Sequence, residues 1–285
     1  MAFVLDGQED LIDTDKPLDV LSYEMVSFGD WQTTNVFPAY LAYSTTMVDN
    51  WFDPKPRLAL DGKRVAVCGY GSSIKDEIET IRNGNYDCII TTSGAHGLLL
   101  EAGIVPNYHV EIDWKPHKSE FTKNAHPDVE YLVSATCHPS TIDNVRGGKC
   151  KLIFVEHGPE INYPDESMTL PPGYDAGQTC IIVAKILGYR ELDLFGFDYS
   201  FSLTGHRHAG PHGGRIHHMF EAKVENKRFL TSKTMFTGLL VMEHFLKQNP
   251  DLNIQIYSDA LLLNFLEGRV RQLAKEKELL NAPST

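Results

Sequence analysis

From residue 58 onward, short apolar runs alternate with segments of helical periodicity, and this alternation constrains the fold more than any other feature of the sequence. The runs are only a few residues long and rich in β-branched side chains, which is typical of buried strands. The segment after the first run carries Ile74, Ile78 and Ile81 at helical spacing. Strands that alternate with helices predict an α/β fold with a largely parallel sheet and helices on both faces.

The expected elements follow these runs in order. Strands are expected at residues 64–68, 87–91, 108–112, 130–134, 151–156, 191–195 and 253–257, and helices at residues 74–83, 95–102, 178–187, 233–248 and 267–281.

The chain is expected to have three parts. Residues 1–57 mix acidic and aromatic side chains and end at the paired prolines Pro54 and Pro56, which favour extended backbone. We expect this N-terminal extension to pack on the body or on another subunit, as the arm of a homo-oligomer or as a platform for an acceptor. Residues 58–265 are expected to form the α/β domain, and residues 266–285 a C-terminal helix and tail.

The net charge of the chain limits the kinds of molecule that it is expected to bind. The chain has 26 Lys and Arg against 38 Asp and Glu, a formal net charge of −12, which argues against a general nucleic-acid-binding protein. No apolar run approaches the roughly 18 residues that span a bilayer, and the first residues lack the basic region of a secretory signal. The five cysteines are scattered without a CxxC pair, which indicates reduced, mostly buried thiols. These features predict a cytoplasmic protein without a membrane span.

A glycine loop directly follows the first expected strand. Gly69-Tyr-Gly71-Ser72-Ser73 stands between that strand and the next helix. Glycines allow a tight turn, and backbone N–H groups at a helix start favour anions, so this loop is a candidate for binding a nucleotide. The alternative is a plain turn in which Ser72 or Ser73 caps the helix. The pattern is neither GxGxxG nor a Walker loop, so an NAD or P-loop assignment fails.

Two aspartates stand where expected strands end. Ligands of open parallel sheets bind beyond the carboxyl ends of the strands, so Asp113 and Asp198 are candidates for the site. The alternative for Asp113 is a helix cap or a loop salt bridge with Lys115. Residues 173–179 place small side chains before another helix, which suits a carboxylate or phosphate ligand. The alternative there is an N-cap at Asp175.

Residues 206–218 hold five of the twelve histidines, together with Arg207 and Arg215. Their glycine and proline content predicts a loop. Histidine offers a general base near neutral pH, and arginine offers a clamp on phosphate. The HxH spacing without a cysteine partner argues against zinc, so no metal site is predicted. The alternative is a polar surface loop.

Taken in order, several segments resemble one family. VAVCGYGSSI and IITTSGAHGLLLEAGIVPNYHVEID are similar to the opening of the MptE-like 6-hydroxymethylpterin diphosphokinase domain, with Ser72 in place of the proline of its G-x-G-P-S-L loop and Ile74 in place of the leucine. YLVSATCHPSTIDNV and GYDAGQTCIIVAKILGYRELDLFGFDYSFSLTGHRHAG resemble its middle strands and its core. The resemblance covers roughly residues 58–265. The same family includes the central domain of Maf flagellin glycosyltransferases and is similar to bacterial sialyltransferases that use CMP-sialic acid.

The resemblance implies a Rossmann-like three-layer sandwich related to GT-A transferases, and it implies roles for single residues. Asp198 and His208 match the family's G-x-D and His-Ala motifs, and with Arg207 they are the expected catalytic residues. The sialyltransferases carry a catalytic histidine just before the late amphipathic helix, whereas residues 229–233 contain none. The residues expected near a donor nucleotide are Gly69, Gly71, Ser72, Ser73, Ser93, Asp113, Gly177, Gln178 and Thr179.

These observations support three hypotheses. The leading one is a glycosyltransferase that moves a sugar from a nucleotide-sugar donor to an acceptor of open class, with His208 as the base and Arg207 or Arg215 on the leaving phosphate. The second is a diphosphokinase that uses ATP and hydroxymethylpterin and requires Mg²⁺, although the aspartate-rich metal signature of those kinases is missing. The third is a non-catalytic nucleotide-binding module, because a fold does not fix a function.

Overall fold

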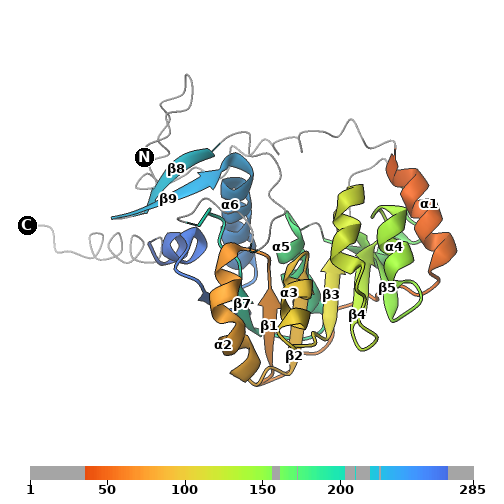
Figure 1. Ribbon diagram of the computed structural model, residues 1–285, viewed down its shortest axis with the longest axis horizontal. Helices are drawn as coiled ribbons and strands as arrows, with labels where there is room; N and C mark the ends of the chain where they lie inside the picture. Colours follow the sequence, from red (N-terminus) through yellow and green to blue (C-terminus); the bar gives the residue numbers. More distant parts are fainter. Residues whose placement is uncertain are drawn as a thin grey trace, which may run out of the picture.

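A parallel sheet forms the centre of the computed structural model, which describes residues 36–155, 161–171, 173–202, 209, 219–224 and 226–268. The sheet has eight strands in the order β10-β7-β1-β2-β3-β4-β5-β6 within these residues, and every pair of neighbours is parallel (Figure 1). Its strands are β1 (Arg64–Cys68), β2 (Cys88–Thr92), β3 (Tyr108–Glu111), β4 (Glu130–Ser134), β5 (Cys150–Val155), β6 (Thr169–Leu170), β7 (Glu191–Phe195) and β10 (Asn253–Tyr257).

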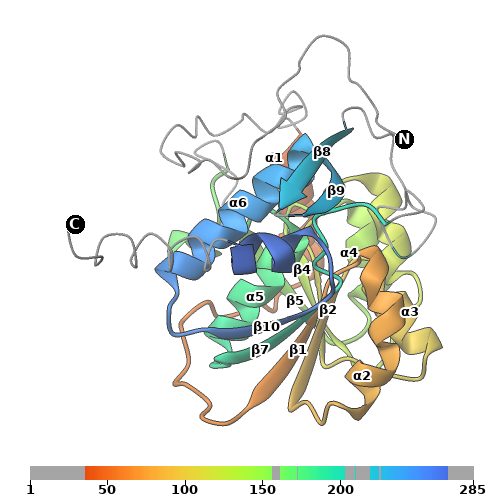
Figure 2. The ribbon, with the colours of Figure 1, turned by 90° about the vertical axis from the view of Figure 1, so that its left-hand side faces the viewer.

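Helices cover both faces of the sheet, so the fold is the expected Rossmann-like three-layer sandwich. The helices α5 (Ala176–Ile186) and α6 (Lys233–Gln248) lie on one face, while α2 (Ile78–Asn83) and α3 (Ala95–Glu101) lie on the other (Figure 2). Toward β5, the helices α4 (Pro139–Val145) and α1 (Phe37–Met47) pack against each other. The 3₁₀ helices are η3 (Ser72–Glu77), η4 (Pro116–Thr122) and η5 (Glu166–Met168), and the strands β8 (Met219–Val224) and β9 (Lys227–Ser232) form an antiparallel hairpin.

The alternation of side chains along the strands explains this layering. Val65 and Val67 of β1 join the core under α5 and α6, whereas Ala66 and Cys68 point to the core under α2 and α3. Because both faces are covered, β1, β4 and β5 are buried along almost their whole length. The edge strand β10, by contrast, alternates exposed polar residues with partly buried apolar ones. The five cysteines are all buried and free of disulfides, as the sequence predicts.

Most expected elements are confirmed at or within two residues of the predicted bounds. The expected helix 74–83 differs, because it begins as the 3₁₀ helix η3 and becomes α-helical only at Ile78. No local sequence pattern predicted α1, α4, β6 or the β8–β9 hairpin. Residues 261–268 are helical, whereas most of the expected helix 267–281 lies outside the described residues.

The described part of the N-terminal extension packs on the body. Phe52 is 3% exposed, and its backbone N donates to the carbonyl of Leu152 in β5. The ring of Trp51 meets that of Phe154 edge to face at 5.3 Å. The extension therefore continues the hydrophobic core past β5. None of the helices in the described residues is long and apolar enough to span a bilayer.

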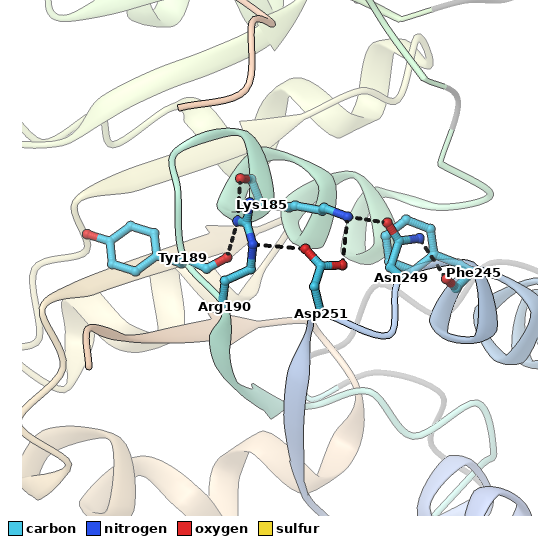
Figure 3. Close-up of polar contacts among 6 residues, drawn as sticks. All are labelled: Lys185, Tyr189, Arg190, Phe245, Asn249 and Asp251. Atoms are coloured by element: carbon cyan, nitrogen blue, oxygen red, sulfur yellow. Dashed lines mark hydrogen bonds and ion pairs between the residues drawn. The ribbon is translucent and has the colours of Figure 1, made fainter. Parts of the chain in front are cut away.

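A charged cluster closes the amino ends of β7 and β10, opposite the end where parallel sheets bind ligands. Asp251 accepts an ion pair from Lys185 at 3.0 Å and from Arg190 at 2.9 Å. Asn249 links the same lysine to the carbonyl of Phe245 in α6 (Figure 3). These contacts join the end of α5 to the end of α6 and leave the carboxyl edge of the sheet to the candidate site.

Candidate functional site

The strand order creates a topological switch point between β1 and β7. From β1 the chain builds the sheet in one direction through β6, and it then returns to place β7 on the other side of β1. Connections on either side of such a point diverge, and ligands of open α/β sheets bind in the resulting crevice at the carboxyl ends of the strands. The loops that follow β1 and β7 contain the glycine loop and Asp198, which the sequence analysis proposed separately.

The glycine loop lies directly against the loop after β7. The backbone N of Gly71 donates to the carbonyl of Gly196 at 2.9 Å. A Cβ on Gly69 would lie 2.8 Å from that same carbonyl oxygen, and a Cβ on Gly71 would lie 2.5 Å from it. Gly196 itself has a φ of +68°, which favours glycine. The glycines are therefore required by the close approach of two backbones.

Asp198 holds the glycine loop in place. Its carboxylate accepts hydrogen bonds from the backbone N of Ser73 at 3.0 Å, from the hydroxyl of Ser72 at 3.2 Å and from the hydroxyl of Ser73. Asp198 is 4% exposed, whereas the two serines are half-buried. The expected alternative, a cap by Ser72 or Ser73, is wrong, because the N-cap of η3 is Gly71 and Asp198 supplies the acceptor from another loop.

Tyr70 joins the glycine loop to its neighbours. Its ring lies on Gly94, where a Cβ would come within 2.1 Å of the Tyr70 Cζ. The centroid of the ring lies 5.8 Å from that of Phe121 in η4, in an edge-to-face arrangement. The backbone carbonyl of Tyr70 accepts a hydrogen bond from the backbone N of Ala209 at 3.2 Å. Ser93, with a φ of +51°, precedes Gly94 after β2. The loops after β1 and β2 thus pack together at the carboxyl edge.

The loop after β3 is organised by a buried carboxyl group. Glu111 is fully buried, and its Oε1 accepts the backbone N of Ile112 and of Asp113, each at 3.0 Å. Burial raises the pKa of Glu111 to about 7. The two hydrogen bonds to Glu111 form a turn that leads to Asp113, which is half-buried at the edge of the sheet.

Asp113 makes its ion pair with a residue of η4. Its Oδ2 lies 3.7 Å from the Nζ of Lys118, and its Oδ1 accepts the backbone N of Lys115 at 3.0 Å. The expected salt bridge with the Lys115 side chain is therefore made by Lys118 instead. The Lys118 ammonium also lies 5.1 Å from the ring centroid of Phe121, the ring that contacts Tyr70.

The start of α5 is shaped by internal hydrogen bonds. Asp175 caps the helix by accepting the backbone N of Gln178 at 2.8 Å, as the alternative interpretation held. The buried Gln178 side chain donates to the carbonyl of Gly238 at 2.9 Å, and the buried Thr179 hydroxyl donates to the Asp175 carbonyl at 3.0 Å. Gly177 is half-buried, and a Cβ there would lie 2.8 Å from the Phe197 ring.

Two buried histidines, His96 of α3 and His109 of β3, lie next to each other. The rings of His96 and His109 are 4.5 Å apart, and His96 Nε2 is 2.9 Å from the hydroxyl of Tyr131. Burial lowers the pKa of His96 to about 4 and that of His109 well below its ordinary value. Both imidazoles are therefore neutral near pH 7.

The structure thus brings most of the expected donor-binding residues to one edge. His208 and Arg207 lie outside the described residues, as does Arg215. Within the part of the chain that is described, no three His, Cys, Asp or Glu side chains cluster as metal ligands would.

Four residues of this region were not predicted from the sequence. Tyr70, Phe121 and Lys118 make contacts between loops that are far apart in the chain, and no local spacing marks such contacts. Glu111 stands within an apolar strand run, where a carboxyl group is conspicuous. Its position was the available signal, because an acid in a buried strand needs hydrogen-bond partners.

Comparisons with known proteins agree with this fold. The family model described as 6-hydroxymethylpterin diphosphokinase MptE-like matches residues 43–204. The structure of Maf glycosyltransferase from Magnetospirillum magneticum AMB-1 is similar, with a TM-score of 0.54 and 18% identity over 85% of this chain. This chain corresponds to 42% of that protein's length.

A more distant similarity is to a mammalian sialyltransferase in complex with Gal-beta-1-3GalNAc-ortho-nitrophenol. Its TM-score is 0.42 and its identity 10%, over 77% of this chain and 78% of that one. No curated protein sequence matches the chain.

Proposed function

The chain belongs to the 6-hydroxymethylpterin diphosphokinase MptE-like family, and from this premise we propose that it is a glycosyltransferase that uses a nucleotide-sugar donor. The observation that carries the proposal is the glycine loop held by Asp198 at the switch point between β1 and β7. The likeness of the whole fold to a Maf glycosyltransferase supports this reaction class over others that such a site serves.

The proposed donor lies along the carboxyl edge. The loop after β1 faces the nucleotide with Gly69, Gly71, Ser72 and Ser73. The loops after β2 and β3 contribute Ser93 and Asp113. The N-terminal turn of α5, which contains Gly177, offers its backbone N–H groups to the donor. The side-chain hydrogen bonds of Gln178 and Thr179 fix the conformation of that turn. Backbone N–H groups at such a turn favour anions.

The proposed chemistry needs a base and a group that stabilises the leaving phosphate. His208 is proposed as the base and Arg207 as the cation. Their chain neighbour Ala209 donates its backbone N to the glycine-loop carbonyl of Tyr70, which supports a role for this segment at the site. Asp198 is proposed to act by fixing the glycine loop, because its carboxylate oxygens already accept hydrogen bonds from Ser72 and Ser73.

A second function is favoured by the family description itself. Transfer of diphosphate from ATP to a hydroxymethylpterin would use the same glycine loop for the ATP phosphates and would require Mg²⁺. A nucleotide-binding module without catalysis remains the third proposal. The division into an N-terminal extension (1–57), a Rossmann-like domain (58–265) and a C-terminal helix and tail (266–285) stays a prediction, as does the cytoplasmic location.

Thermal unfolding with added nucleotides separates these proposals. A ligand at 100 times its dissociation constant adds about 2.7 kcal/mol of stability. Stabilisation by CMP, UDP or GDP without metal, followed by turnover of the corresponding nucleotide sugar, supports the glycosyltransferase. Stabilisation only by ATP or ADP with Mg²⁺, with AMP release in the presence of hydroxymethylpterin, contradicts it and supports the diphosphokinase. Stabilisation without turnover of either substrate class leaves the binding module.

A matched pair of variants locates the bound nucleotide. In Gly71→Ala the added Cβ would lie 2.5 Å from the Gly196 carbonyl and would force the loop to move. In Gly97→Ala, on α3, the added Cβ meets nothing within 4 Å. The proposal expects the first variant to lose nucleotide stabilisation and the second to keep it.

A further inference from the structure

We propose that Lys118 binds the phosphate of the nucleotide ligand, an inference that deepens the proposed function and rests on it. The sequence predicts a phosphate-binding positive charge at Arg207 or Arg215. The structure assigns a basic side chain from η4, a segment to which no role was given.

Asp113 holds the Lys118 side chain in position but does not occupy all of its hydrogen-bond donors. Its Nζ lies 3.7 Å from the Oδ2 of Asp113, and the side chain is only 21% exposed. Charge-assisted hydrogen bonds are shorter than this, at about 2.7–2.9 Å. An ammonium group has three donors, so Lys118 retains donors for a ligand that arrives at the carboxyl edge.

Aromatic contacts connect this ammonium group to the glycine loop. The Nζ of Lys118 lies 5.1 Å from the Phe121 ring centroid, and that ring meets Tyr70 at 5.8 Å. Tyr70 stands between Gly69 and Gly71 in the loop that Asp198 holds. Neighbouring strands are about 4.8 Å apart, and β2 alone separates β1 from β3. The glycine loop after β1 and the Lys118 loop after β3 are therefore separated by no more than the width of three strands, a span that a nucleotide bound on the glycine loop can cover.

The charge of the site favours a second cation near the bound phosphate. The chain has a net charge of −12, and the same edge carries the carboxylates of Asp113 and Asp198. An anionic phosphate is repelled by this field unless a nearby cation offsets it, and a partly buried cation acts more strongly than one in open solvent. Lys115 lies three residues earlier in the chain and is exposed, so it is the natural comparison.

The test compares Lys118→Met with Lys115→Met, which change the net charge equally. The ligands are CMP, UDP, GDP and ADP, each beside its unphosphorylated nucleoside, with inorganic pyrophosphate as a separate probe. Lys118→Met is expected to bind the preferred nucleotide about ten-fold more weakly, the effect of losing one charged hydrogen bond. Its nucleoside affinity should stay within two-fold of wild type. Lys118→Arg should recover part of the loss because the charge remains.

Each outcome decides one of the two proposals. Equal losses in the two methionine variants overturn the Lys118 assignment, because net charge alone would then explain them. Unchanged nucleotide binding in Lys118→Met also overturns it and leaves the proposed function standing. If wild type binds no nucleotide, the proposed function fails. Pyrophosphate binding that disappears only in Lys118→Met would then still support an anion site at Lys118, and its absence would overturn that site too.

Discussion

The carboxylate of Asp198 accepts the backbone N of Ser73, a residue 125 positions earlier in the chain, at 3.0 Å. This bond joins the loop after β7 to the loop after β1 at the switch point of the sheet. It also replaces the side-chain cap that η3 lacks. One buried side chain thereby fixes the backbone on which the proposed nucleotide site depends.

Replacing Asp198 by alanine is expected to lower the free energy of unfolding by about 2–3 kcal/mol, because hydrogen bonds to a charged group are lost and Ser73 keeps an unpaired N–H. Nucleotide stabilisation should be lost as well. Asp251→Ala is the control, since it breaks exposed ion pairs at the opposite end of the sheet and should cost about 1 kcal/mol or less. Chemical denaturation with and without nucleotide measures both effects. Full nucleotide binding by Asp198→Ala would contradict the role of this contact.

Replacing Gly94 by alanine is expected to displace the Tyr70 ring, because the added Cβ would lie 2.1 Å from the ring's Cζ. Overpacking of this kind costs about 1–3 kcal/mol. Tyr70→Ala removes the obstacle, so Gly94→Ala should cost far less in the Tyr70→Ala background. A double-mutant cycle on unfolding free energies measures this coupling. Additive costs would show that the ring does not rest on Gly94.

The buried Glu111 should make stability fall as pH rises. Its pKa is raised from 4.5 to about 7, chiefly by burial. Between these two values the folded protein keeps a proton that the unfolded chain has lost, so the free energy of unfolding decreases with increasing pH in this window and levels off above it. Glu111→Gln cannot ionise and should remove this slope. Denaturation curves from pH 4.5 to 8 for both proteins provide the test, and parallel profiles would refute it.

The buried His96 acts in the opposite direction. Burial lowers its pKa from 6.5 to about 4, so in that window the unfolded chain holds a proton that the folded protein lacks. Stability is therefore lost as pH falls from 6.5 toward 4, and His109 adds to the same loss. His96→Gln should flatten the acid side of the profile. An acid slope that is unchanged in this variant would assign the loss to other groups.

Local sequence patterns predicted every strand of the described sheet except β6, but they did not predict the contacts that build the site. β1, β4, β7 and β10 occupy the predicted residues. In β1 and β4 the apolar run reflects burial on both faces, whereas the edge strand β10 alternates polar and apolar residues. α1 and α4 were not identified, since few of their residues show the pattern of a long amphipathic helix. The hairpin of β8 and β9 was also missed.

In the candidate site too, local patterns predicted single residues but not the contacts between them. Proximity of Asp198 to the glycine loop follows from the strand order, which the sequence does not display. The contacts of Tyr70 with Gly94 and Phe121 likewise depend on how separate loops pack. Position after a strand was therefore an informative signal for the aspartates, whereas the Tyr70 ring and the Lys118 ammonium group required coordinates.

The adjacency of β1 and β7 also orders events during synthesis. Strands β1 to β5 are neighbours in the sheet in the order in which the ribosome delivers them, whereas β7 must return to a strand made more than a hundred residues earlier. Pairings of such long sequence separation form slowly. A nascent chain that ends before residue 191 has the glycine loop but no Asp198 to hold it, so the loop arrangement at the proposed nucleotide site cannot form until β7 and the loop after it have been made.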